Sequence, residues 1–251
     1  MPGVSRNSTE EVVILRVRPV GEIHASVRML SRVSGLLDAM AYGARSRKGS
    51  LRGTVVPFAL GTCYLYTDPV KGSTKITDLA IREYHPEIRE NLKKFYVASL
   101  WAEVILYSYA AGSEGEAVWS LMSEALFLLA SEEESSADAI NVQFLWRFLE
   151  LLGMRPELPA EPRGSYRYLP EEHRFAPSEE LSDEESREGG VTLSGGSLAY
   201  LATAGERGLA QALKITLSPG QRGELKALLF RLVQESAERE LKTIRSGEGI
   251  L

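Results

Sequence analysis

The feature that most constrains the fold of this chain is a series of five short apolar segments between Glu11 and about Ile81. In the first segment, Val13, Leu15 and Val17 recur with the two-residue period of a half-buried strand. Five strands within about 70 residues predict a small closed or partly closed barrel, since an open sheet would leave two edges unprotected. The five-stranded OB barrel matches this length and strand count. The other four segments lie at residues 25–33, 36–44, 54–67 and 73–81.

The pattern becomes helical at His85-Pro86, because proline suits the first position of a helix and apolar residues then recur every three to four positions. Three apolar helices are predicted before Gly153, the second opening with a Ser113/Glu116 capping box. A last helix opens at Ser218-Pro219-Gly220-Gln221, which combines a capping box with an early proline. We interpret these apolar stripes as the core of a helical bundle.

The sequence therefore predicts an α+β chain of two domains: an OB barrel at residues 1–82 and an α-helical domain at residues 83–251. Residues 155–196 interrupt the helical domain with prolines, glycine pairs and an acidic cluster, and we expect an irregular or partly disordered insertion there. Residues 1–80 carry a net charge of +5 and residues 81–251 carry −10. This asymmetry indicates a basic N-terminal module that binds an anionic partner.

The most basic segment is residues 43–53, which hold three glycines, two serines and four cations. Glycine lets the backbone come close to a ligand, while arginine, lysine, serine and exposed amides can all bind phosphate oxygens. The same composition also suits a solvated basic hairpin loop. Because the segment lies between strands of a basic barrel, phosphate binding is the better interpretation.

Aromatic residues accompany these cations: Tyr42 precedes the loop, and Tyr64 and Tyr66 are spaced to share one strand face. A positive groove with aromatic platforms holds single strands without sequence preference, since every base offers a face for stacking. Rings that plug the barrel interior are the alternative, and we expect Tyr64 or Tyr66 to be exposed. The predicted DNA-binding residues are Arg28, Arg32, Tyr42, Arg45, Arg47, Lys48, Arg52, Tyr64, Tyr66, Lys71 and Lys75.

Signatures of catalysis and of metal binding are absent from the sequence. It contains no P-loop and no nucleophile elbow, and the glycine-rich residues 189–197 lack the lysine of a phosphate loop. Cys63 is the only cysteine, so no internal disulfide forms, and His173 is expected to be solvated. No signal region or membrane-length apolar run is present. We expect a cytoplasmic protein with no catalytic residue, metal or cofactor and no membrane contact.

The ordered set of segments resembles the bacterial RecO family of recombination mediators. The resemblance is carried by residues 13–22, 34–37, 42–47, 56–58, 144–156 and 240–246, with Gly43-Ala44-Arg45 as the strongest single motif. It implies an OB domain joined to a helical domain, binding of single-stranded and double-stranded DNA, annealing of complementary strands, and assistance in loading a recombinase in RecF-pathway recombination.

The resemblance also implies partners and one departure. The partners are RecR and the C-terminal tail of the single-stranded DNA-binding protein, with the recombinase reached indirectly, in a nucleoid-associated setting. Many relatives carry four cysteines in the insertion after Gly153, but this chain has none there. A zinc site is therefore not expected.

Two other functions fit the residues. An RNA-binding OB module is compatible with the barrel, because contacts to 2′-hydroxyl groups leave no recognisable sequence signature. A protein-interaction adaptor, whose basic loop binds an acidic partner, is compatible with the charge pattern. Affinities for matched DNA and RNA oligomers separate the first alternative, and binding to an acidic tail without single-strand binding favours the second.

Overall fold

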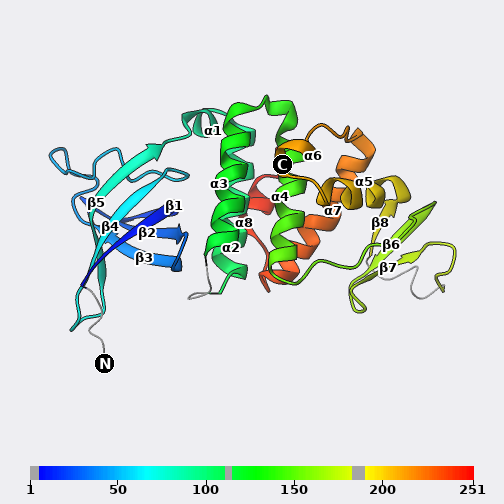
Figure 1. The fold of residues 1–251 in the computed structure, drawn as a ribbon, viewed down its shortest axis with the longest axis horizontal. Coiled ribbons are helices and arrows are strands. Elements are labelled where there is room, and N and C mark those ends of the chain that lie inside the picture. Colours follow the sequence, from blue (N-terminus) through cyan, green and yellow to red (C-terminus); the bar gives the residue numbers. More distant parts are fainter. Residues whose placement is uncertain (1–5, 111–114, 183–189) are drawn as a thin grey trace. The chain divides into compact units, whose positions relative to one another are not determined.

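The computed structural model describes residues 6–110, 115–182 and 190–251 (Figure 1). The chain divides into two compact units. The first unit covers residues 1–131 and contains a barrel followed by helices. The second unit covers residues 132–251 and contains the remaining helices and a small sheet.

The predicted five-stranded barrel is confirmed. Its strands follow the order β1-β2-β3-β5-β4 around a closed barrel. Neighbouring strands pair antiparallel, except that β3 and β5 close the barrel as a parallel pair with Met40 opposite Lys75. The strands are β1 (Asn7–Val20), β2 (His24–Ser31), β3 (Gly35–Ala41), β4 (Leu60–Thr67) and β5 (Thr74–Glu83).

Strand β1 is buried on both faces in its middle, which differs from the predicted half-buried strand. Val12 and Ile14 belong to the core inside the barrel, while Val13 and Leu15 are also buried, on a strand that contacts helices. An irregularity in the pairing between Ile14 and Arg16 then shifts the alternation, so that Val17 packs against the barrel core. The inward-facing residues before this bulge are therefore the even-numbered ones.

Cys63 lies on β4 and is completely buried in the barrel core. Burial raises the pKa of its thiol to about 12, helped by the negative charges of Glu10 and Asp78. The thiolate is the reactive form of cysteine, so this side chain is a small apolar core group.

Helices α1 (Pro86–Glu90), α2 (Leu92–Ser108) and α3 (Glu116–Ser131) complete the first unit. Pro86 opens α1 as predicted, and the Asn91 side chain caps α2 by accepting a hydrogen bond from the Lys94 amide. Both α2 and α3 contact β1. The predicted cap at Ser113 lies outside the described residues.

In the second unit, α4 packs against α7, and their buried apolar faces form the predicted bundle core. The Ser218/Gln221 capping box at the start of α7 is confirmed, and Gly153 (φ 68°) follows the end of α4. In the described ranges, no helix has both the length and the apolar character needed to cross a membrane. The helices are η1 (Glu134–Ser136, 3-10), α4 (Ala137–Leu151), α5 (Gly195–Gly205), α6 (Leu209–Ala212), α7 (Pro219–Ser236) and α8 (Lys242–Ser246).

The prediction that residues 155–196 are irregular needs correction. The described part contains an antiparallel three-stranded sheet of order β7-β6-β8, made of β6 (Ser165–Leu169), β7 (Arg174–Pro177) and β8 (Val191–Ser194). These strands are only four or five residues long and are bounded by proline and glycine, so their sequence signal is weak. Tyr168, Phe175 and Leu193 of this sheet are buried, and β8 contacts α5 and α7.

Candidate nucleic-acid interface

The basic loop, residues 43–53, follows β3 and is anchored by two apolar residues. Ala44 and Leu51 are buried in the barrel core. A turn tightens the loop, since the Ser46 amide donates to the Gly43 carbonyl over 2.9 Å. With the apolar residues directed inward, the cations are left exposed: Arg45, Arg47, Lys48 and Arg52.

Within the part of the chain that the structure describes, these four cations have no carboxylate partner. The Arg45 guanidinium lies 3.5 Å from the Gly21 carbonyl, and the Arg52 guanidinium donates to the Arg47 carbonyl over 3.3 Å. Carbonyl groups are neutral, so the four positive charges stay uncompensated. The loop is therefore suited to attract phosphate groups.

The loop docks on the turn between β1 and β2. The Arg45 amide donates to the Ile23 carbonyl (3.0 Å), and the Gly43 amide donates to Nδ1 of His24 (3.1 Å). The rings of His24 and Tyr42 meet edge to face, with centroids 5.0 Å apart, and Tyr42 stays 53% exposed. The loop thus has a fixed base beside an exposed aromatic ring.

Sequence reasoning missed His24. Its closeness to the loop follows from the pairing of β2 with β3, in which Ala25 lies opposite Ala41 and the preceding histidine reaches the residues after β3. Knowing where the strands begin and end does not determine which residues lie opposite one another.

A second group of predicted residues lies on β4, β5 and the turn between them. Lys75 on β5 places its ammonium 5.0 Å from the centroid of the Tyr66 ring, a cation–π contact. Tyr64 is 41% exposed, as expected for one of the two tyrosines, and Tyr66 is half-buried. Because Lys75 is opposite Met40, this group lies next to the end of β3, where the basic loop begins.

The turn between β4 and β5 presents exposed Lys71 on an ordered backbone. Asp68 Oδ1 accepts hydrogen bonds from the amides of Lys71 (3.1 Å) and Val70 (2.8 Å). These two bonds lower the pKa of Asp68. The lysine therefore extends from a turn that its own backbone helps to fix.

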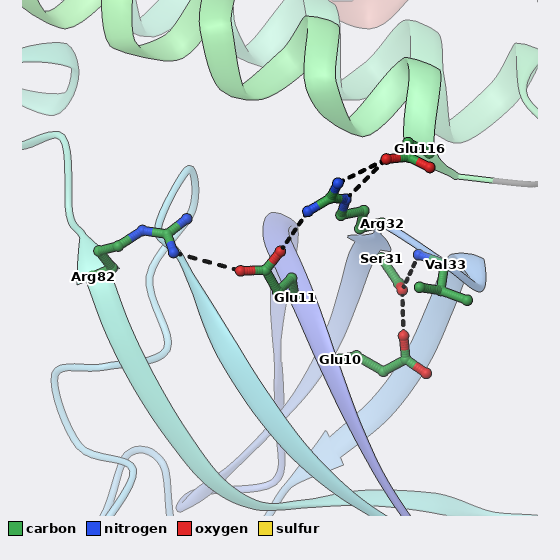
Figure 2. A network of polar contacts seen from close by, with 7 residues as sticks. All are labelled: Glu10, Glu11, Ser31, Arg32, Val33, Arg82 and Glu116. Atoms are coloured by element: carbon green, nitrogen blue, oxygen red, sulfur yellow. Dashed lines mark hydrogen bonds and ion pairs between the residues drawn. The ribbon is translucent and has the colours of Figure 1, made fainter.

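The other two predicted cations are held in ion pairs. On β2, Arg28 pairs with Asp38 on β3 over 2.8 Å. Arg32 directly follows β2, where it pairs with Glu116 of α3 (2.7 Å) and with Glu11 of β1 (3.3 Å), as Figure 2 shows. The hydrogen bond with Glu116 is the largest of several contacts that raise the pKa of Arg32.

The surroundings of Arg32 form a joint between the barrel and α3. Its guanidinium also stacks over Trp119, 5.5 Å from the ring centroid, and Arg82 reaches the other oxygen of Glu11 over 3.5 Å (Figure 2). A Cβ atom at Gly115 would lie 2.0 Å from the Ser31 carbonyl, so the start of α3 approaches the barrel too closely for any other residue. We call these contacts the Arg32 joint.

The insertion after Gly153 does not fit a zinc ion. Residues 154–196 contain no cysteine, and among the described residues no group of three or more histidine, cysteine, aspartate or glutamate side chains is arranged to hold a metal. A hydrogen-bonded cluster holds the β6–β7 hairpin instead. The Tyr168 hydroxyl lies 2.8 Å from His173 Nδ1, and His173 Nε2 lies 3.2 Å from the Met154 carbonyl.

The expectation that His173 is solvated is confirmed, and the cluster adds hydrogen-bond partners that the sequence did not predict. His173 remains exposed, but both of its ring nitrogens are hydrogen bonded. Burial raises the pKa of Tyr168 to about 12, assisted by the charge of Glu235. The phenol therefore stays protonated throughout the neutral range and keeps its hydrogen for donation.

Two family models match the chain. Recombination protein O N terminal matches residues 6–84, and Recombination protein O C terminal matches residues 89–245. The first match contains the barrel and the second contains most of the helices together with the small sheet.

Individual proteins are also similar to this chain. A DNA repair protein RecO of Neisseria meningitidis is 30% identical over 226 residues, which cover 84% of this chain and 81% of that protein. Proteins of the same name from Desulfosudis oleivorans and Desulfatibacillum aliphaticivorans are each 30% identical, over 64% and 60% of this chain. The aligned part spans only 60% and 58% of the length of these two relatives.

Proposed function

The chain belongs to the RecO family of recombination proteins, and from this membership we propose that it is a non-catalytic DNA repair and recombination mediator. In this proposal it binds single-stranded and double-stranded DNA, anneals complementary strands and assists recombinase loading in RecF-pathway recombination. One observation carries the proposal: the exposed cations of the basic loop stand on a buried apolar anchor and lack carboxylate partners in the described ranges.

The residues of the interface take different parts in this proposal. The four loop cations bind phosphates, and Lys71 and Lys75 continue the same positive track. Arg28 and Arg32 contribute less to DNA binding, because each is already neutralised by a carboxylate. Bases stack on three aromatic rings, those of Tyr42, Tyr64 and Tyr66.

Annealing needs no catalytic group under this proposal. A surface that binds strands through their backbones leaves the base edges free to find complements. Base pairing then supplies the free energy, and the protein only brings two anionic strands together by reducing their repulsion. No cofactor takes part in these steps.

Partners complete the proposal by family resemblance. RecR and the C-terminal tail of the single-stranded DNA-binding protein are the proposed protein partners, and a cytoplasmic, nucleoid-associated location follows from the proposed DNA binding. The tail of the coating protein is acidic, so it competes with DNA for any cation that both contact.

Alanine replacement of two loop arginines tests the proposed interface. The Arg45→Ala/Arg47→Ala variant should bind an unstructured single-stranded oligonucleotide more weakly, whatever its sequence. The slope of log affinity against log salt should flatten by about 1.4, because each phosphate contact on single strands contributes about 0.7. Fluorescence anisotropy at several salt concentrations measures both quantities.

The matched control is Arg207→Ala/Lys214→Ala, which removes the same charge from exposed positions of the second unit. It should leave the slope unchanged. A loop variant that keeps wild-type affinity at low salt contradicts the proposed interface. Parallel titrations with RNA of the same sequence test the alternative ligand, since an RNA preference would assign the surface to RNA.

A further inference from the structure

His24 is a polar side chain of the barrel that the proposed DNA contacts leave unused. It is half-buried at the first position of β2, where it lies opposite Val20 of β1. Its Nδ1 accepts the hydrogen bond of the Gly43 amide over 3.1 Å, and its ring contacts the Tyr42 ring. One imidazole thus touches both the aromatic residue and the first residue of the basic loop.

This contact fixes the protonation state of the imidazole. A backbone amide is always a donor, so Nδ1 must be without a proton, and the ring is neutral with its hydrogen on Nε2. An imidazolium carries hydrogens on both nitrogens and would direct one of them at the Gly43 amide. The docked loop is therefore compatible with the neutral ring alone.

The remaining loop attachments do not titrate in this way. The Arg45 amide bonds to the Ile23 carbonyl, and the Arg45 guanidinium approaches the Gly21 carbonyl. The ionisable neighbours of the imidazole in the chain and across the strands are Glu22 in the same turn, Arg18 diagonally across on β1, and Tyr42 and Arg45 on the side of the loop. Among these attachments, the bond to His24 is the one whose acceptor is lost when a side chain takes up a proton.

We propose that His24 is a positioning residue, whose neutral imidazole holds the basic loop and Tyr42 in the DNA-binding arrangement and releases them when it is protonated. This inference rests on the proposed DNA binding by the loop. Without this contact with His24, Gly43 and the Tyr42 ring can move. The loop cations then no longer have a fixed position relative to the ring on which a base stacks. The protein should then bind single strands more weakly at acid pH, although it has gained a positive charge.

Two substitutions of His24 test its hydrogen-bond acceptor and its aromatic ring separately. His24→Phe keeps an aromatic edge against Tyr42 but has no acceptor, whereas His24→Asn places a carbonyl oxygen near the position of Nδ1 and does not titrate. The Gly43 amide is monitored by hydrogen exchange, expressed as protection relative to the free peptide. Affinity for oligo-dT is measured at pH 7.5 and 5.5 at constant ionic strength, since thymine does not take up a proton there.

When the pH is lowered from 7.5 to 5.5, the Gly43 amide of the wild-type protein should lose its protection from hydrogen exchange. The affinity for oligo-dT should fall about fivefold, which corresponds to the free energy of one neutral hydrogen bond. His24→Phe should show both losses already at pH 7.5, and His24→Asn should retain both properties at either pH. Unfolding curves check that each variant folds.

Two results overturn the inference: wild-type binding that strengthens at pH 5.5, or a His24→Phe variant that binds like wild type. The proposed function fails separately, if Arg45→Ala/Arg47→Ala leaves oligo-dT binding intact while Gly43 protection still depends on His24.

Discussion

The basic loop and the Arg32 joint place cations of the same kind on one barrel in opposite surroundings. The loop cations have carbonyl neighbours and an apolar anchor beneath them. Arg32 is exposed but contacts Glu11, Glu116 and Trp119, which come from β1 and α3. A cation without a partner can bind an external anion, whereas a cation with two carboxylates holds elements of its own chain together.

The two groups of cations also differ in how far along the chain their contact partners lie. The contacts of the loop cations lie within 24 residues, but Arg32 and Glu116 are 84 residues apart. The number of cations in a short stretch of sequence therefore identifies the basic loop. The same count does not distinguish Arg32 from the loop cations. Only the packing of α3 on the barrel distinguishes them.

The largest effect should come from reversing the charge of the loop. Arg45→Glu/Arg47→Glu should weaken single-strand binding roughly 100-fold at low salt, because two attractions to phosphate become repulsions. Thermal unfolding should be nearly unchanged, since both side chains are exposed. A large fall in the unfolding midpoint would show that the loop has a structural part like that of the Arg32 joint.

Removing the Tyr42 ring should have the next largest effect. Tyr42→Leu should weaken binding to oligo-dT about tenfold, because stacking on an aromatic side chain contributes strongly for each base. The control is Phe127→Leu, which alters a 62% exposed ring on α3. Equal losses in both variants would remove the distinction between the ring at the loop and an aromatic elsewhere on the surface.

The Arg32 joint should show the converse behaviour. Arg32→Met should lower the midpoint of thermal unfolding by about 2 °C, because it removes the link between β1 and α3. Affinity for single strands should change by less than about twofold at moderate salt. If Arg32→Met instead reduced the salt slope as a loop arginine does, Arg32 would belong to the DNA interface.

The smallest effect concerns Asp68, which orders the turn that presents Lys71. Folding lowers the pKa of Asp68, so its ionised carboxylate stabilises the turn above about pH 4, and this stabilisation is lost as the pH falls further. Asp68→Asn should flatten the decrease of the unfolding midpoint as the pH falls below about 4, and it should slightly strengthen DNA binding at neutral pH, because it removes a negative charge that interacts with Lys75. Identical pH profiles for both proteins would contradict this account of the turn.

Much of the fold follows from local patterns. The five barrel strands, the helix start at Pro86 and the capping box at Ser218 are all visible in the sequence, because strand period and capping chemistry are local properties. The sheet of β6, β7 and β8 is not visible in this way. Its short strands gain stability from contacts such as that between Tyr168 and His173. Such contacts cannot be predicted from the hydrophobicity of a short stretch of sequence.

The candidate interface was predictable to the same extent. The basic loop and its exposed tyrosine neighbours follow from composition and spacing. The role of His24 depends on the β2–β3 register, and the pairing of Arg28 with Asp38 depends on the same register. Residues that owe their position to strand pairing need the structure before they can be assigned.

The burial of Cys63 has a practical consequence for following the loop. Burial raises the pKa of the only native thiol to about 12 and covers its side chain completely, so maleimide dyes will not label it in the folded protein. A single exposed cysteine introduced by Ser50→Cys can therefore carry a fluorophore without any change to the native core. Energy transfer from that dye to a labelled oligonucleotide would report the distance between the loop and the strand, and so test the proposed contact directly.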